Sequence, residues 1–103
     1  MSKLPECLMV VTAQVDTAVE DEWNHWYDTV HLPEILDCPG FLDARRYVTE
    51  SDGKREYITI YELLSPDAMA GETFNSRRGW YQFAASVTAS VRLFTVARKE
   101  KLI

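Results

Sequence analysis

The sequence from residue 22 to residue 41 reads EWNHWYDTVHLPEILDCPGF, which places several aromatic side chains and a histidine close together. Side chains four residues apart lie on one face of an α-helix, so Trp23, Tyr27 and His31 should form a single row. A row of large aromatic side chains that ends in a titratable group is typical of a pocket wall. It is equally typical of a core stripe with a polar end. The sequence leaves both interpretations open.

The start and the end of this helix also have sequence signals. Residues 17–20 read Thr-Ala-Val-Glu, which resembles a capping box, and two further acids follow in the first turn. Pro33 disfavours helical geometry at Leu32, so the helix should end near His31. Pro33 itself can begin a further short turn that reaches Leu36. A turn is then expected at residues 38–40, which read Cys-Pro-Gly.

The flanking segments predict four strands and a second helix. Residues 4–15 are apolar at both alternating sets of positions, which is typical of a central strand covered on both faces. Residues 41–49 and 57–63 alternate in polarity, and the Ser-Asp-Gly-Lys sequence between them favours a hairpin. Ser-Pro-Asp at residue 65 favours the start of a second helix, which glycines should break into pieces up to about residue 85. Residues 89–98 form the last expected strand.

This order, β-α-β-β-α-β, predicts an α+β fold of the ferredoxin-like kind, with a four-stranded antiparallel sheet and both helices on one face. At 103 residues, the chain should form one domain over residues 1–103. Two helices cover one face of the sheet only, whereas the strands carry apolar and aromatic residues on both faces. The second face should therefore meet another copy of the chain in a homodimer.

Composition limits the partners and the compartment. A formal net charge of −5 argues against nucleic acid or an anionic membrane as a partner. The sequence has no apolar run near the roughly 20 residues that span a bilayer. Pro5 and Glu6 interrupt the region where a signal peptide needs an apolar run, so a cytoplasmic protein is expected. Cys7 and Cys38 lie in unrelated contexts, which is typical of free thiols.

The central motif resembles a known family. It consists of Trp23, Trp26, Tyr27, Asp28, His31, Leu32, Pro33, Glu34, Pro39, Gly40, Phe41, Ala44, Arg45, Arg46 and Tyr47. It is similar to the EthD-like family of the dimeric α/β-barrel superfamily. The resemblance implies a dimer whose two sheets close into a barrel, with a pocket in each subunit between the helices and the sheet. The superfamily includes cofactor-free monooxygenases, polyketide cyclases, muconolactone isomerases, haem-degrading enzymes and accessory proteins, so no single reaction is implied.

His31 is the strongest candidate for a catalytic residue. Its pKa lies near the working pH, and the dipole of a helix C-terminus favours its protonated form. The alternative is a structural histidine that holds the carbonyls of the helix end. Asp28 can reach His31 across one turn and could orient the imidazole, while Glu34 and Asp43 are the other acids that could serve. His25 and His31 should point in different directions, so no metal site is expected.

The candidate substrate-binding residues are all aromatic. They are Trp23, Trp26, Tyr27, Tyr47, Tyr61, Trp80 and Phe83, and each of them could instead be a core residue. The strand tyrosines Tyr47, Tyr57 and Tyr61 would supply phenol donors if they face the helices, or build a dimer interface if they face away. Residues 73–87 fit no pattern of the family and are where substrate choice would lie.

An aromatic hollow with one base and a few donors suits proton transfer at an acidic C–H. The sequence therefore favours a cofactor-independent enzyme of isomerase, cyclase or lyase type, acting on a small hydrophobic carbonyl or phenolic metabolite with His31 as general acid/base. One alternative is a non-catalytic protein that binds a hydrophobic ligand or assists a catabolic or biosynthetic pathway. A weaker alternative is a haem-binding or cofactor-free monooxygenase member. Hydrolase triads and nucleotide enzymes are disfavoured, because no nucleophile elbow or Gly-rich phosphate loop is present.

Overall fold

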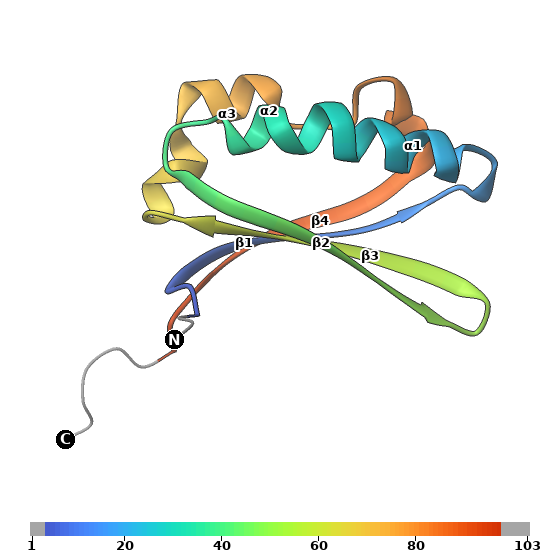
Figure 1. Cartoon of the computed structure of the whole chain (residues 1–103), viewed down its shortest axis with the longest axis horizontal. Coiled ribbons are helices and arrows are strands. Elements are labelled where there is room, and N and C mark those ends of the chain that lie inside the picture. The colour runs from blue at the N-terminus through green and yellow to red at the C-terminus, as the bar shows by residue number, and fades with distance from the viewer. Residues whose placement is uncertain (1–3, 98–103) are drawn as a thin grey trace.

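The structure is a computed structural model that describes residues 4–97. Four antiparallel strands form one sheet in the order β2-β3-β1-β4. The strands are β1 (Cys7–Val15), β2 (Phe41–Ser51), β3 (Lys54–Leu63) and β4 (Val87–Thr95). Figure 1 shows the helices α1, α2 and α3 lying over one face of this sheet. The predicted ferredoxin-like α+β fold, with the first strand in a central position, is confirmed.

The helical layer consists of two connected series of short segments. The first series is η1 (Thr17–Val19), α1 (Glu20–Trp26), η2 (Tyr27–His31) and α2 (Leu32–Leu36). The second series is η3 (Pro66–Ala70), α3 (Glu72–Arg77) and η4 (Tyr81–Ser86). The second series is broken into pieces, as the glycines predicted. The last strand was expected at residues 89–98, of which residue 98 lies outside the described residues.

The prediction that the first helix ends near His31 is wrong. Leu32 has helical dihedral angles, φ −60° and ψ −48°, and the helix continues to Leu36. The η2 segment is a π-helical turn, in which the N–H of Leu32 donates to the carbonyl of Tyr27, five residues back. This wide turn precedes Pro33, which lies in the first turn of α2 and has no N–H to donate to the preceding turn.

The predicted capping box at residues 17–20 is also wrong. Asp16 is the N-cap residue, without a side-chain hydrogen bond to the helix. The carboxylate of Glu20 turns toward the sheet, where it accepts hydrogen bonds from the hydroxyl of Tyr57 and from Nε of Arg55. These two donors compete with the helix N-terminus for Glu20. The cap at Ser65 is confirmed, because its Oγ accepts from the N–H of Asp67 at 3.2 Å.

The predicted turns close where expected. Asp52 and Gly53 both have positive φ angles, 55° and 75°, as a two-residue hairpin turn between β2 and β3 requires. Gly40 also has a positive φ, 88°, and a Cβ at this position would lie 2.8 Å from the Cβ of Ala68. Only glycine fits this turn, which leads from α2 into β2.

The two faces of the sheet have different environments. The face toward the helices carries the buried residues of the core, among them Met9, Val11, Thr59, Tyr61 and Leu63. The opposite face carries half-buried apolar side chains such as Leu8, Val10, Ile58 and Ile60, and no helix of residues 4–97 covers it. Cys7 and Cys38 are buried free thiols. In the described part of the chain, no helix has the length and apolar character to span a membrane.

Candidate active site

A cavity of about 110 Å³ lies between the helical layer and the sheet. Its floor is made by apolar side chains of the central and edge strands, Met9, Val11 and Val91. Its remaining walls come from the first helical series, from β3, from α3 and from the segment that follows α3. These residues include Tyr27, His31, Ile35, Tyr61, Phe74 and Trp80. The cavity is therefore mostly apolar and aromatic, with few polar atoms.

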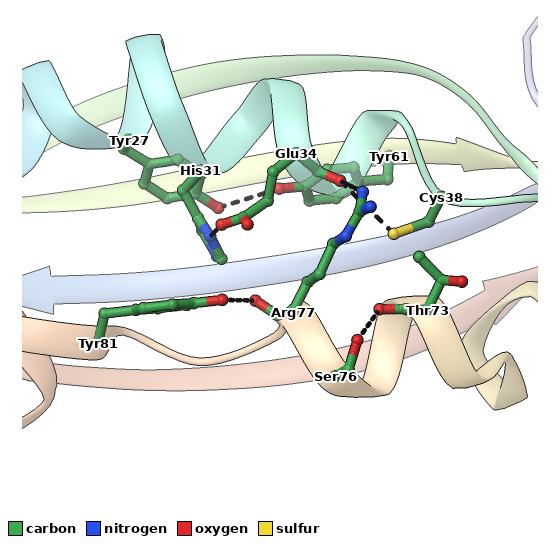
Figure 2. A network of polar contacts seen from close by, with 9 residues as sticks. All are labelled: Tyr27, His31, Glu34, Cys38, Tyr61, Thr73, Ser76, Arg77 and Tyr81. Carbon is green, nitrogen blue, oxygen red and sulfur yellow. Dashed lines mark hydrogen bonds and ion pairs between the residues drawn. The ribbon is translucent and has the colours of Figure 1, made fainter.

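His31 is the histidine that lines this cavity. It is only 4% exposed and lies at the end of the π-helical turn. Its Nδ1 lies 3.2 Å from Oε1 of Glu34, as Figure 2 shows. Its ring stacks on the indole of Trp26, with centroids 4.7 Å apart and planes at 11°. Two neighbours thus fix the orientation of the imidazole.

The environment of His31 favours a neutral imidazole. Burial lowers the pKa of His31 below its ordinary 6.5, and the hydrogen bond with Glu34 opposes this shift. In the neutral ring, an N–H on Nδ1 that donates to the Glu34 carboxylate leaves the lone pair on Nε2. No hydrogen bond to Nε2 is present within residues 4–97. The arrangement can act as a general base.

Two tyrosines place hydroxyl groups near this base. The hydroxyl oxygens of Tyr27 and Tyr61 lie 3.4 Å apart, and both residues line the cavity (Figure 2). Burial raises the pKa of both side chains, so they remain neutral phenols. Within such a pair, one hydroxyl donates to the other. The second hydrogen can go to Thr59, which also contacts the Tyr27 hydroxyl, or to an oxygen of a ligand.

Arg77 ties α3 to the end of the first helical series. Its Nη1 donates to the carbonyl oxygen of Glu34 at 2.8 Å and to Oδ2 of Asp37 at 3.2 Å. The carbonyl oxygen of Arg77 accepts a hydrogen bond from the hydroxyl of Tyr81, which lies beside His31 (Figure 2). Arg77 therefore holds the backbone of Glu34 in place. Sequence reasoning missed this role, since no local pattern links residues so far apart.

Trp80 lines the cavity, and Tyr81 follows it in the chain and lies beside His31. The indole of Trp80 lies 5.6 Å from the ring of His31 and 5.4 Å from that of Tyr27, measured between centroids. Tyr81 has a φ of 53°, which is uncommon for a bulky side chain and is found at functional sites more often than elsewhere. This pair occupies the part of residues 73–87 where the sequence placed substrate choice.

Seven aromatic residues were predicted to bind substrate, and the structure places them in three groups. Tyr27, Tyr61 and Trp80 line the cavity together with His31. The second group, Trp23, Trp26 and Phe83, packs around that wall: Trp23 is fully buried, and Phe83 lies 5.3 Å from Trp26. Tyr47 stands alone as the third group. It is 48% exposed on the face of the sheet away from the helices, next to Ile58.

Asp28, the acid predicted to orient His31, does not contact it. The side chain of Asp28 is exposed and pairs with Arg46, whose Nη1 lies 2.7 Å from Oδ1 of the aspartate. Glu34 takes the place expected for Asp28. Asp43 lies on β2, where one of its carboxylate oxygens accepts from the N–H of Ala44. Across residues 4–97, no group of three or more His, Cys, Asp or Glu side chains is arranged to hold a metal ion.

Residues 7–79 match the family described as a domain of unknown function, DUF4286. The chain belongs to this family. No curated protein sequence matches this DUF4286 chain. Its fold is similar to that of several solved structures at low sequence identity.

Three of these structures bear on the sequence analysis. SnoaB from Streptomyces nogalater, a cofactor-independent oxygenase, has a TM-score of 0.64 and 18% identity, with 91% of this chain and 96% of SnoaB covered. An EthD family protein from Bacillus halodurans has a TM-score of 0.64 and 10% identity, with 84% and 96% covered. The haem degrader MhuD from Mycobacterium tuberculosis has a TM-score of 0.63 and 16% identity, with 92% and 99% covered. The resemblance to the EthD-like and dimeric α/β-barrel proteins is thus confirmed for the fold.

Proposed function

We propose that this chain is a small cofactor-independent enzyme that transfers a proton at an acidic C–H of a hydrophobic carbonyl or phenolic compound. The observation that carries this proposal is the arrangement of His31. Its imidazole is buried and neutral, its Nδ1 is bonded to Glu34, and its Nε2 is free of hydrogen bonds within the described residues. The same side chain lines an aromatic cavity.

The chemistry follows from the groups around the cavity. Nε2 of His31 takes the proton from a carbon next to a carbonyl, and the electron pair of the C–H bond moves toward the carbonyl oxygen to give an enolate. A hydroxyl of the Tyr27–Tyr61 pair donates to that oxygen. Return of the proton from Nε2 to a different carbon completes an isomerisation, and no oxidant or reductant is consumed. Glu34 stabilises the imidazolium that forms in between.

The similar structures agree with this chemistry in part. The cofactor-independent oxygenase SnoaB shows that the fold accommodates reactions without a cofactor. Haem is the weaker alternative, because the space beside His31 in one chain is small, about 110 Å³. A haem-binding role for His31 would produce a Soret band when the purified protein is mixed with haemin, and we expect none.

We further propose that the chain acts as one domain within a homodimer. The uncovered face of the sheet carries Val10, Ile58 and Ile60, which are half-buried within one chain, beside Phe94, which is 41% exposed. A second copy would bury these apolar side chains. A structure of similar fold is described as a dimeric ferredoxin-like protein. The buried free thiols Cys7 and Cys38 support a reducing compartment such as the cytoplasm.

The test of the proposed function is deuterium exchange into benzoylacetone, a neutral aromatic diketone with an acidic C–H. We expect the wild-type protein to accelerate exchange and His31→Ala to lower this rate by roughly two to four powers of ten, the usual share of a general base. His25→Ala is the matched control, because His25 is exposed on the same helix. No acceleration by the wild-type protein, or full acceleration by folded His31→Ala, would leave a ligand-binding role.

A further inference from the structure

One cation lies at the cavity. Arg78 follows α3 directly and lines the same cavity as His31. Its guanidinium carbon lies 5.1 Å from the centre of the Phe74 ring, which is itself a wall of the cavity. Arg78 is an exposed residue, and its contact with Phe74 places the charged group at the edge of the apolar wall.

The charge of Arg78 is not compensated by an acid of the described chain. Its one hydrogen bond goes to the amide oxygen of Asn75, at 3.4 Å. Three other arginines are paired: Arg77 with Asp37, Arg46 with Asp28, and Arg55 with Glu20. Arg45 and Arg92 also have no ion pair among the described residues, but neither of them lines the cavity. None of the ion pairs within residues 4–97 involves Arg78. Its guanidinium therefore keeps donors for another partner.

The lining of the cavity has no negative charge that could neutralise Arg78. Its lining includes no Asp or Glu, and Glu34 is engaged by the imidazole of His31. The formal charge of the whole chain is −5, so general attraction does not draw anions to its surface. An anion that binds here needs a local cation, and a planar guanidinium matches the two oxygens of a carboxylate.

We propose that the ligand of this site is a small aromatic or alicyclic carboxylic acid, held by its carboxylate at Arg78 and by its apolar body in the cavity. This inference rests on the proposed function for the place of the site and adds the class of the substrate. Arg78 binds the carboxylate, Phe74 and Trp80 contact the ring, and the acidic carbon lies toward His31. A keto acid combines the carboxylate with the acidic C–H that the base requires.

The test compares two probes that differ by one carboxylate, phenylpyruvate and phenylacetone, in binding measured by titration calorimetry. The wild-type protein should bind phenylpyruvate more tightly than phenylacetone. Arg78→Gln should weaken phenylpyruvate binding by at least about tenfold, the size expected for a lost charge-assisted hydrogen bond, and phenylacetone binding by less than about twofold. Arg78→Lys should lie between the two, because it keeps the charge and loses the planar pair of donors.

Lys54→Gln is the control for net charge. It removes one positive charge at the exposed hairpin between β2 and β3 and should leave the affinity for both probes unchanged. An equal loss of affinity for both probes in Arg78→Gln would overturn the carboxylate assignment. Tighter binding of phenylacetone than of phenylpyruvate by the wild-type protein would overturn it too. Circular dichroism of each variant separates loss of folding from loss of binding. The proposed proton transfer is tested separately, since its test uses the neutral benzoylacetone and the His31 variant.

Discussion

Nη1 of Arg46 donates a hydrogen bond of 2.7 Å to Oδ1 of Asp28, and this contact engages one of the two acids that lie three residues from His31 in sequence. Nη2 of the same arginine donates to Asn24, also at 2.7 Å, so a residue of β2 holds two residues of the first helical series. The acid that reaches His31 is Glu34, one turn further along. The tertiary contact between Arg46 and Asp28 thus leaves Glu34 as the partner of the imidazole.

Glu34→Gln should lower the rate of benzoylacetone exchange by about ten- to a hundredfold, the usual cost of removing an orienting partner of a histidine. It should also lower the pKa of His31 further, because Glu34 is the group that raises this pKa. Asp28→Asn is the matched control and should leave both quantities near the wild-type values. Exchange rates and NMR titration of His31 measure the effects. A larger loss in Asp28→Asn than in Glu34→Gln would restore the role first predicted for Asp28.

The stability of the protein should depend on pH through His31. Its folded pKa is below the unfolded 6.5, so between these two values the unfolded chain binds a proton that the folded chain does not. The free energy of unfolding should therefore fall as the pH falls from about 6.5 toward the folded pKa, and it should be constant above 6.5 as far as His31 is concerned. Urea denaturation at a series of pH values measures this slope.

His31→Gln should lose this part of the pH dependence. The lowered pKa of Glu20 acts in a more acidic range, below the ordinary 4.5 of a glutamate, so its contribution is separate. The exchange rate of the wild-type protein should rise with pH and level off above the folded pKa, with its midpoint below 6.5. A midpoint above 6.5, or an unchanged slope in His31→Gln, would show that burial does not control this histidine.

Pro33→Ala should impair proton transfer more than stability. Alanine restores an N–H that can bond within the helix, which favours rewinding the π-helical turn at Tyr27–His31 into an α-helix. The rotation would move His31 relative to the cavity and lower the exchange rate by about tenfold or more. Pro66→Ala, at the start of η3, is the control for losing a proline at a helix start. A lower melting temperature with a normal rate per folded molecule would contradict this expectation.

Ile60→Glu should shift the protein from dimer to monomer. Ile60 lies in the middle of the uncovered face, next to Arg45 and Val10 in the two neighbouring strands, and a buried carboxylate there would have to lose its water. Val30→Glu is the control, because Val30 is 49% exposed on the helical layer. Sedimentation equilibrium at micromolar concentration measures the change. A wild-type monomer, or a dimer that tolerates Ile60→Glu, would exclude this interface.

Local rules were sufficient for the order of the elements. Alternating polarity identified the two strands of the hairpin, and apolar residues at both alternating sets identified the central first strand. The turn residues Asp52 and Gly53 closed the hairpin with the positive φ angles that they favour. Ser65 capped the second helical series as its side chain predicts. The four-residue spacing of Trp23, Tyr27 and His31 was sufficient to place all three in the interior. Each of these features depends on residues a few positions apart, where sequence spacing and spatial distance agree.

The details of the site depended on contacts between distant residues. Arg46, from β2, engages Asp28, and Arg77, from α3, fixes the backbone of Glu34. The π-helical turn keeps the helix intact past Pro33, where a rule for neighbouring residues predicts a break. The sequence by itself thus determined the fold and the buried aromatic row. Only the tertiary structure decided which acid orients the histidine, because hydrogen-bond partners compete through space and their ranking depends on geometry that the chain acquires when it is folded.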